Sequence, residues 1–374
     1  MPPAIPSRRA VLLASAGALL GAAVPGSAHA ARAPFGKYGT PAARLTSRTL
    51  YVDAAGRGDH TTVQAAVSAT PTGATATTGW TLVLAAGTYR ETVTVPASRP
   101  YLTVVGATGN ARDVVIVYGN AAGTPRPDGT VLGTTGSATA TLAGAGFTAR
   151  DLTFANDWLR ADHPGWTGTQ AVAVKATGDR SSFLRCRFLG HQDTLYADSP
   201  SLAVFARQYY GKCYVEGDVD FVFGRATAVF DRCELRTLAR TDLASTPQGF
   251  VFAPSTARAN PRGFLARQCT FTSTAPAGAY CLARPWVPGS DPTAWPMLTV
   301  RQSVIGAGID AAAPYANMSA TYPWQSQRFA EYANTGPGAV VTVPAARPQL
   351  TEEQAAAHTR EAYLLGGDNW QPWL

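Results

Sequence analysis

The sequence has little of several features that would point to other classes of protein. Only 15% of its 374 residues are charged, and it contains five cysteines and three methionines. After the first thirty residues, no apolar stretch reaches the roughly 20 residues that a transmembrane helix needs. No basic run is interleaved with aromatic residues, so nothing indicates nucleic-acid binding. No tight C-x-x-C pair occurs, which argues against a metal site.

The N-terminus has the pattern of an export signal. Arg8 and Arg9 precede an apolar stretch over residues 10–24, and a small-residue A-H-A cleavage motif follows it. The paired arginines favour the twin-arginine route. Val11 stands where that signal usually has Phe, which leaves the general secretory route open. We therefore expect residues 1–30 to be removed, leaving a secreted, extracellular protein without a membrane anchor.

Residues 31–374 are predicted to form a single domain. The signal contains two of the 31 basic residues, so 29 remain against 24 acidic residues, a formal charge of +5. A mildly basic exported protein suits a polyanionic partner. Helical periodicity is scarce and occurs at 61–69, where Thr61 or Thr62 would be the cap, and at 351–365.

Between these two helices, short runs of Val, Ile, Leu, Phe and Thr recur about every ten residues. This pattern fits a β-sandwich, a β-propeller or a β-solenoid. Four cysteines favour the solenoid, because they share a local setting. Each follows a polar residue, and one residue separates it from a following apolar residue. The intervals between successive cysteines are 27, 20 and 36 residues. They are Cys186, Cys213, Cys233 and Cys269. Each unit would be one turn of an all-β coil, with like residues stacked between turns and the terminal helices capping the ends.

Two aspartates are candidates for the chemistry. Asp193 lies in GHQDTLY and Asp220 lies in GDVDFVFG, 27 residues further on. Consecutive turns of such a coil lie about 4.8 Å apart, so the two carboxyl groups could be neighbours. Two close carboxylates repel each other, which leaves one protonated as a general acid and the other ionised. The alternative is a pair of unrelated surface aspartates.

The segment GDVDFVFG is predicted to be a β-strand, although Asp is disfavoured in strands. Alternation turns its three large apolar residues to one face, toward the core, and Asp220 to the other face, along an external groove. The three apolar residues are Val219, Phe221 and Phe223. The same alternation would send Gln192 and Asp193 to opposite faces, so the chain must bend there if both line one site.

Neutral and cationic side chains complete the candidate site. Gln170 and Gln192 carry amide donors that suit an oxyanion developing during a reaction. Arg284 can bind the Asp220 carboxylate through two parallel hydrogen bonds and keep it ionised. Trp286 follows two residues later, where it could form a platform for a sugar ring or simply pack under a loop.

Taken together, these segments resemble the pectin methylesterases (pectinesterases, carbohydrate esterase family 8). The resemblance spans nearly the whole mature chain in the family's order. The matching segments are VDAAGRGDHTTVQAAVSATP from 52, GTYRE from 87, QAVAV from 170, SSFLRCRFLGHQDTLY from 181, CYVEGDVDFVFG from 213, LARPW from 282, FAEYANTGPGA from 329 and NWQP from 369. The resemblance implies a right-handed parallel β-helix and a monomer that hydrolyses the methyl esters of galacturonate in pectin, releasing methanol without a metal or organic cofactor.

The resemblance also implies a role for each candidate. Asp220 would be the nucleophile that attacks the ester carbonyl, and Arg284 would orient it and hold its charge. Gln170 and Gln192 would stabilise the tetrahedral oxyanion. Asp193 would donate a proton to the departing methanol and then accept one from the water that cleaves the acyl-enzyme.

Further residues are assigned by the same resemblance. Trp286, Tyr196 and Phe221 would contact the sugar chain in the groove. Cys213 and Cys233 stand where bacterial relatives can carry a disulfide, so they are the predicted pair.

The chain departs from the family pattern in three places. Ala283 stands where the family usually has Gly, which matters only if the backbone there needs a positive φ. The segments 197–207 and 287–297 are longer than expected, which puts substrate preference along the groove in doubt. Trp295 and Tyr315 are candidates to replace a groove tryptophan of the family.

Two alternative functions remain open. A pectate lyase also uses a β-helix and a polyuronate, but it needs calcium held by clustered acids and a basic residue for elimination, whereas here glutamines flank the aspartates. A non-catalytic polysaccharide-binding β-solenoid would tolerate loss of either aspartate, yet all five polar positions are filled.

Overall fold

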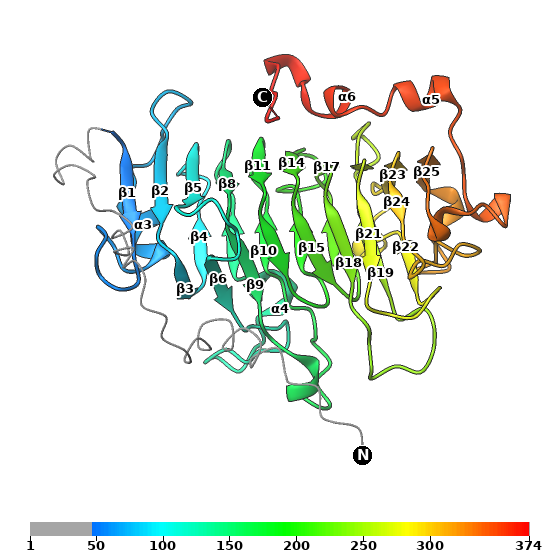
Figure 1. Cartoon of the computed structure of the whole chain (residues 1–374), viewed down its shortest axis with the longest axis horizontal. Coiled ribbons are helices and arrows are strands. Elements are labelled where there is room, and N and C mark those ends of the chain that lie inside the picture. The colour runs from blue at the N-terminus through cyan, green and yellow to red at the C-terminus, as the bar shows by residue number, and fades with distance from the viewer. Residues whose placement is uncertain (1–46, 374) are drawn as a thin grey trace, which may run out of the picture.

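From β2 onward, strands that follow one another in the chain lie in different sheets, and the strands within each sheet run parallel. A computed structural model describes residues 47–373. In the central part of the coil each turn passes through a ten-stranded, an eight-stranded and a seven-stranded sheet in that order (Figure 1). Parallel connections of this kind are right-handed almost without exception. The protein is therefore an all-β, right-handed parallel β-helix, which confirms the predicted fold class.

The three sheets run the length of the coil. The ten-stranded sheet contains β1 (Thr49–Val52), β2 (Trp80–Leu84), β5 (Leu102–Gly106), β8 (Thr148–Arg150), β11 (Ser181–Leu184), β14 (Arg207–Gly211), β17 (Thr227–Asp231), β20 (Phe264–Arg267), β23 (Met297–Arg301) and β25 (Arg328–Tyr332). The eight-stranded sheet contains β3 (Gly87–Arg90), β6 (Val114–Tyr118), β9 (Thr153–Asn156), β12 (Arg187–Leu189), β15 (Tyr214–Gly217), β18 (Glu234–Thr237), β21 (Thr270–Ser273) and β24 (Val304–Ile305). The seven-stranded sheet contains β4 (Val93–Val95), β7 (Ala140–Leu142), β10 (Val174–Ala176), β13 (Leu195–Ala197), β16 (Val222–Gly224), β19 (Gly249–Pro254) and β22 (Tyr280–Ala283).

The intervals between the cysteines equal the residue offsets between paired strands of the ten-stranded sheet. Ser181 pairs with Gln208, Gln208 with Ala228, and Ala228 with Phe264, which are separations of 27, 20 and 36 residues. The four cysteines therefore occupy the same corner of four successive turns, between the ten-stranded and the eight-stranded sheet. The residue before each cysteine has a left-handed backbone and an exposed side chain, which accounts for the polar residue at that position. These residues are Arg185, Lys212, Arg232 and Gln268.

The structure contradicts the predicted disulfide between Cys213 and Cys233, because both are buried free thiols. The Cys213 thiol donates to the carbonyl of Phe183 at 3.3 Å, and the Cys233 thiol donates to that of Tyr210 at 3.1 Å. Side chains stacked in register on parallel strands lie about 4.8 Å apart, whereas a disulfide needs β-carbons at about 3.8 Å. The corner thus keeps its thiols reduced and hydrogen-bonded.

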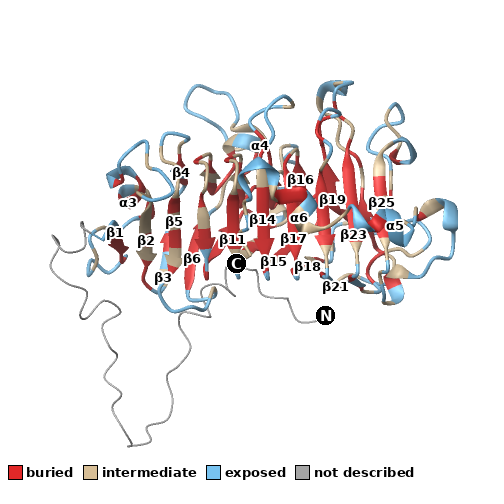
Figure 2. Cartoon of the chain, turned by 90° about the horizontal axis from the view of Figure 1, so that it is seen from above, coloured by how far each residue is buried: buried red, intermediate tan, exposed pale blue. Residues whose placement is uncertain are grey.

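The inside of the coil is filled by aromatic side chains stacked in register. Phe183 stacks on Tyr210 with ring centroids 4.9 Å apart, and Tyr210 stacks on Phe230 at 4.7 Å. In-register parallel strands place equivalent side chains one strand spacing apart, which suits offset stacking of rings. Seen from above, the strands are largely buried while the loops are exposed (Figure 2). The core therefore runs along the axis of the coil.

The predicted early helix is present as α3 (Val63–Ala69) and covers the N-terminal end of the coil, where it packs on β1, β2 and β4. Thr62 is its N-cap, as predicted. The Glu91 carboxylate also accepts hydrogen bonds from the first-turn amides of Val63 and Gln64, at 2.7 and 2.8 Å. These contacts satisfy amides that a helix start leaves without partners. The prediction of a capping helix is confirmed at this end.

The late helix, predicted over 351–365, is two short helices, α5 (Glu352–Ala356) and α6 (Arg360–Leu364). They do not cap the coil. They run back along its outside, where α6 packs on β14 and β17 (Figure 1). Tyr363 and Leu364 bury their side chains there. The prediction of a C-terminal cap is wrong, because the apolar face of this segment covers the outer side of the ten-stranded sheet. The other helices of residues 47–373 are α4 (Gly133–Gly136), η1 (Arg160–Asp162), η2 (Pro288–Ser290), η3 (Trp324–Ser326), η4 (Pro337–Ala339), η5 (Pro344–Ala346) and η6 (Gly366–Asp368).

A buried ion pair stabilises the C-terminal end of the coil. Arg347 is fully buried and forks onto Glu331 at 3.0 and 2.7 Å. The Tyr315 hydroxyl donates to the same carboxylate at 3.1 Å, so Tyr315 is a core residue and not the groove aromatic that was expected.

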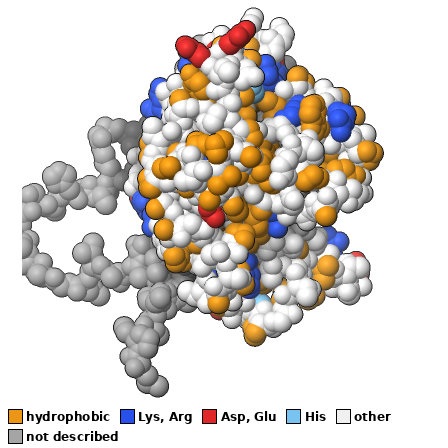
Figure 3. Space-filling model, turned by 90° about the vertical axis from the view of Figure 1, so that its right-hand side faces the viewer, with side chains coloured by type: hydrophobic (Ala, Val, Ile, Leu, Met, Phe, Trp, Pro, Cys, Tyr) orange, Lys and Arg blue, Asp and Glu red, His pale blue; other side chains and the backbone are white. Residues whose placement is uncertain are grey.

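Figure 3 looks onto the C-terminal end of the coil, where hydrophobic atoms are spread over much of the surface. Val304 and Val340 are among its exposed apolar residues.

Candidate active site

A cavity of about 520 Å³ lies over the seven-stranded sheet. Its walls are formed by β13, β16 and β19 and by loops that leave the coil on either side. The lining residues are Leu132, Gly133, Thr134, Thr135, Gln170, Gln192, Asp193, Tyr196, Asp220, Phe223, Arg225, Ala253, Arg284, Trp286 and Met318. The structure thus brings together seven of the eight predicted site residues. Phe221 is the exception.

The two aspartates occupy equivalent positions on successive turns. Leu195 pairs with Val222, 27 residues away, and the same offset relates Asp193 to Asp220. Both aspartates have a left-handed backbone, with φ of 65° and 49°. The strand predicted through GDVDFVFG is therefore wrong at Asp220, since β15 ends before it and β16 begins after it. Aspartate is one of the few residues that tolerates this conformation, which resolves its placement in an apolar segment.

The two bends are hydrogen-bonded to each other. The Asp218 amide donates to the carbonyl of His191 at 3.0 Å, and the Asp193 amide donates to the carbonyl of Val219 at 3.0 Å. Gly217 is required beside them, because a β-carbon there would lie 2.5 Å from the His191 carbonyl oxygen. The bend at 192–193, which the sequence required if both residues line one site, is confirmed.

The bend at Asp220 also changes which aromatic residues face outward. Phe221 has no exposed surface and belongs to the core, so its predicted contact with substrate is wrong. Phe223, which alternation had assigned to the core face, lines the cavity and stacks on Tyr196 at 4.1 Å. Trp286 lies 5.6 Å from the Phe223 ring and 6.0 Å from the Tyr196 ring. These three residues form an aromatic wall on one side of the cavity.

Arg284 forms a two-point ion pair with Asp220. Its Nε donates at 2.9 Å and its Nη2 at 2.6 Å to the two oxygens of the carboxylate, as predicted. The Arg284 guanidinium also lies over the Phe250 ring at 4.1 Å, which fixes its plane. Burial raises the pKa of Asp220, and the arginine acts against this by lowering it. The fork therefore favours the ionised form of a carboxylate that is only 7% exposed.

Asp193 is almost as buried as Asp220, at 8% exposure, but it has no comparable ion pair within residues 47–373. Burial raises its pKa well above the usual range, and the nearby Asp220 charge raises it further. The two carboxyl groups thus differ in their surroundings, which favour the ionised form at Asp220 and the protonated form at Asp193. Such an asymmetric pair can supply a nucleophile and a proton donor to one substrate.

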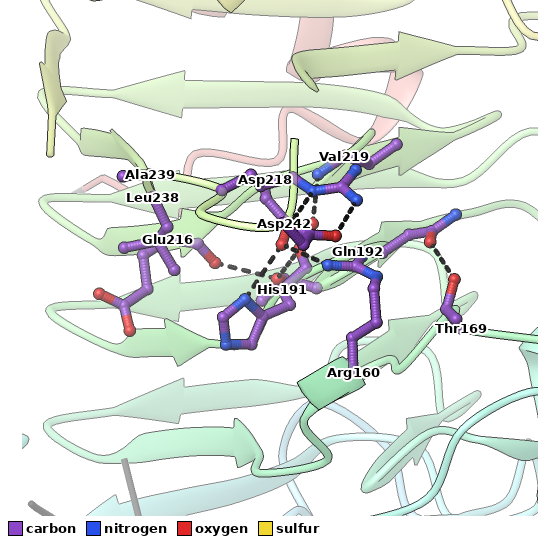
Figure 4. A network of polar contacts seen from close by, with 12 residues as sticks. Arg160, Thr169, His191, Gln192, Glu216, Asp218, Val219, Leu238, Ala239 and Asp242 are labelled. Atoms are coloured by element: carbon purple, nitrogen blue, oxygen red, sulfur yellow. Dashed lines mark hydrogen bonds and ion pairs between the residues drawn. The ribbon is translucent and has the colours of Figure 1, made fainter. Parts of the chain in front are cut away.

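Thr169 orients the Gln192 amide, although no motif in the sequence points to this residue. Its hydroxyl donates to Gln192 Oε1 at 2.6 Å (Figure 4). Because the amide oxygen is engaged there, the amide NH₂ is the end left to bind in the cavity. Gln170 lines the same cavity. The two glutamines can therefore offer N–H groups to an oxygen that becomes negatively charged.

Arg225 is a second lining residue that was not predicted. Its guanidinium lies 5.8 Å from the Trp286 ring, and its Nη1 is 3.4 Å from Asp198. Trp295, by contrast, does not line the cavity, because its indole N–H donates to the Ser326 carbonyl at 2.9 Å. Arg225 adds a cationic group beside the aromatic wall.

The departures from the family pattern leave the site intact. Ala283 is a buried residue of β22 and is not among the residues with positive φ, so its replacement of Gly causes no backbone strain. The long segment 197–207 leaves the coil between β13 and β14 and exposes Val204 and Phe205.

Within residues 47–373 no cluster of three His, Cys, Asp or Glu side chains could hold a metal ion. In the same part of the chain, no helix has the length and apolar character to cross a membrane.

An asymmetric carboxyl pair, an arginine fork and amide donors on one β-helix face are typical of a hydrolase that transfers an acyl group. The family model for Pectinesterase matches residues 49–368. The chain therefore belongs to the pectinesterase family, the carboxylic ester hydrolases that de-esterify pectin.

Relatives from bacteria and plants support this membership. A pectinesterase of Ralstonia solanacearum is 35% identical over 318 residues, which cover 77% of this chain and 79% of the relative. Pectinesterase 31 of Arabidopsis thaliana is 31% identical over 339 residues, covering 88% and 96%. The solved structure of pectin methylesterase PemA from Erwinia chrysanthemi has a TM-score of 0.75 and 29% identity, covering 87% of this chain and 98% of that one. A pectin methylesterase in complex with a hexasaccharide matches equally well, with a TM-score of 0.75 and the same identity and coverage.

Proposed function

We propose that this pectinesterase works through Asp220 as nucleophile, Asp193 as general acid and base, and the amides of Gln170 and Gln192 as the oxyanion site. One observation carries the assignment: Arg284 forks onto Asp220, which favours its anion, while Asp193, on the adjacent turn, is buried with no such ion pair among residues 47–373, which favours its protonated form. A carboxylate and a carboxylic acid in one small cavity can act in a single reaction.

In the first half of the reaction, an Asp220 oxygen attacks the carbonyl carbon of the methyl ester. The carbonyl oxygen becomes an oxyanion and accepts hydrogen bonds from Gln170 and Gln192, which are neutral and so gain most when the charge develops. The carbon–oxygen bond to the methoxy group then breaks. Asp193 gives its proton to that oxygen, so methanol leaves and an acyl-enzyme anhydride on Asp220 remains.

In the second half, Asp193 is ionised and can accept a proton. It takes one from water as the water oxygen attacks the acyl carbon, and the same amides hold the new oxyanion. Collapse of this intermediate releases the galacturonate carboxylic acid and restores Asp220 as an anion. Arg284 stabilises Asp220 each time it returns to the charged form.

The substrate chain would be methyl-esterified homogalacturonan, which lies over the aromatic wall of Tyr196, Phe223 and Trp286. The hexasaccharide bound by a relative 29% identical to this chain supports an oligosaccharide-sized groove. A formal charge of +5 on residues 31–374 suits a polyuronate. We further propose that these residues act as one secreted, extracellular domain and as a monomer, after removal of the export signal over residues 1–30, which lies outside the described residues.

The function is tested by measuring methanol release from methylated pectin in the presence of a chelator. We expect release that the chelator does not change. An unsaturated product that the chelator abolishes would indicate a lyase, and binding of pectin without methanol release would indicate a non-catalytic solenoid. Either outcome would refute the proposal.

The residue roles are tested by two substitutions. Asp220→Asn is expected to abolish turnover and keep pectin binding, whereas Asp113→Asn, an exposed aspartate before β6, is the control and should change neither. Gln192→Ala is expected to lower kcat by roughly 10² to 10³-fold, the usual loss on removal of one oxyanion donor. Retained activity in Asp220→Asn would mean that another residue is the nucleophile.

A further inference from the structure

A third carboxylate, Asp218, is buried beside the two aspartates of the cavity, with 1% of its surface exposed. One of its oxygens accepts the amide of Val219 at 2.7 Å. The other accepts from His191 Nδ1 at 3.1 Å and from Arg160 Nη1 at 3.3 Å. Figure 4 shows that these side chains converge on Asp218 from separate elements. Asp218 does not line the cavity, and the proposed reaction does not use it.

The register that stacks the two catalytic aspartates also stacks His191 on Asp218. His191 lies two residues before Asp193, and Asp218 lies two residues before Asp220, so the same offset of 27 residues separates both pairs. The Asp218 amide donates to the His191 carbonyl, and its own carbonyl accepts the amide of Phe250 on β19 at 3.1 Å. The backbone and side chain of Asp218 together connect three successive turns of the coil.

The charge of Asp218 acts on both catalytic aspartates. Its proximity raises the pKa of Asp193 and the pKa of Asp220. His191 and Arg160 outweigh its burial and hold the pKa of Asp218 at about 2, so it is ionised at every pH at which the enzyme would act. Further titratable groups around this network come from the loop between β18 and β19, from β22 and from β15. They are Arg240, Asp242, Tyr280 and Glu216.

The position of His191 is fixed mainly by Asp218. Its ring makes one hydrogen bond to the described part of the chain, from Nδ1 to Asp218, while Nε2 is buried with no partner there. The adjacent bend at residues 192–193 is thus connected to Asp218 through this side chain.

We propose that Asp218 is a positioning residue which, held by His191 and Arg160, fixes the two catalytic bends and sets the pH range in which Asp220 is ionised while Asp193 is protonated. This inference rests on the proposed function. In it, a permanent negative charge outside the cavity keeps Asp193 protonated at higher pH than burial alone would allow. It raises the pH at which Asp220 ionises as well, and Arg284 limits that second effect.

The test is the pH dependence of kcat/KM for methanol release by Asp218→Asn. Asparagine retains an oxygen that can accept from the Val219 amide and removes the charge. Because the Asp218 charge raises the pKa of both catalytic groups, its loss should move both limbs of the profile to lower pH, by roughly half a unit or more. Asp113→Asn is the matched control, and both of its limbs should stay in place. A role in folding alone would lower the plateau or the Tm and leave the limbs of an active Asp218→Asn variant unmoved, which would overturn the proposal.

A second variant changes the charge balance in the opposite direction and does not depend on the folding of Asp218→Asn. Arg160→Gln removes a cation that offsets Asp218, so both limbs should move to higher pH. Limbs that stay in place, or that move to lower pH, would overturn the proposal. Wild-type protein that releases no methanol would refute the proposed function itself, whereas unmoved limbs in an active variant refute only this inference.

Discussion

Replacing Arg284 with Gln should move the acid limb of the pH–rate profile to higher pH. The proposed reaction requires Asp220 as an anion. Burial and the neighbouring Asp218 raise the pKa of Asp220, and Arg284 is the group that lowers it. Gln can still donate one hydrogen bond but carries no charge. With the cation gone, Asp220 stays protonated to a higher pH, so activity at low pH is lost first.

The size of the shift follows from the geometry of the pair. Two hydrogen bonds at 2.9 and 2.6 Å join groups whose side chains are 23% and 9% exposed, so solvent screens them only in part. Each hydrogen bond to a charged group contributes about 1.5 to 3 kcal/mol. One pH unit corresponds to about 1.4 kcal/mol, and Gln retains one donor. We therefore expect the acid limb to move up by roughly 1 to 2 pH units.

The assay is the initial rate of methanol release from methylated pectin, measured as kcat/KM across pH. Arg284→Lys is the matched variant, since it keeps the charge and loses the fork, so its limb should move less than that of Arg284→Gln. The reasoning would be refuted if Arg284→Gln lowered the plateau while its acid limb stayed at the wild-type position.

Three further predictions concern other parts of the molecule. Thr169→Val removes the donor that orients Gln192 and should lower kcat by roughly tenfold at similar KM, as expected for one hydrogen bond; steady-state rates equal to wild type would remove this role from Thr169. Phe183→Ala opens the aromatic stack and should cost about 3 to 5 kcal/mol of unfolding free energy in urea, with kcat at 25 °C retained; a cost below about 1 kcal/mol would contradict the packing described for the core. Thiol titration of the denatured, unreduced protein should find all five cysteines, and a reductant should leave the Tm unchanged; two missing thiols would show that a disulfide such as Cys213–Cys233 forms after all.

The coil and the central ion pair could be predicted from the sequence because they depend on spacing and on charge. The intervals between cysteines report the length of each turn, since only residues in register can repeat the same local setting. Asp220 in an apolar segment needs a cation, and Arg284 was a candidate for that role. The offset of 27 residues between the aspartates equals one such interval, which brings them together on adjacent turns.

The error in the placement of Phe223 has one physical cause, which is that a single residue with positive φ resets the alternation of side chains. After the left-handed bend at Asp220, Phe221 lies in the core and Phe223 lines the cavity, whereas an unbroken strand would turn both toward the core. No propensity scale identifies such a residue in advance, although a disfavoured aspartate was the available sign.

Other residues were missed because their roles depend on contacts between distant segments. Thr169 reaches Gln192 across 23 positions of the chain, and Arg160 reaches Asp218 across 58. His191 and Asp218 are different, because they share the 27-residue offset of the catalytic pair. That offset, applied to every polar residue near Asp193, would have found them.

The segment 197–207 shows how this architecture keeps a loop separate from the strands that position the two aspartates. The positions of Asp193 and Asp220 are set by hydrogen bonds between β-strands of adjacent turns. The residues of the segment 197–207 leave the coil after β13 and rejoin it before β14. A change in the length of that excursion alters the surface next to β13 without altering the spacing of the two aspartates. Loops could therefore be exchanged between relatives as cassettes, so that the range of polysaccharides accepted is engineered while the chemical step is inherited unchanged.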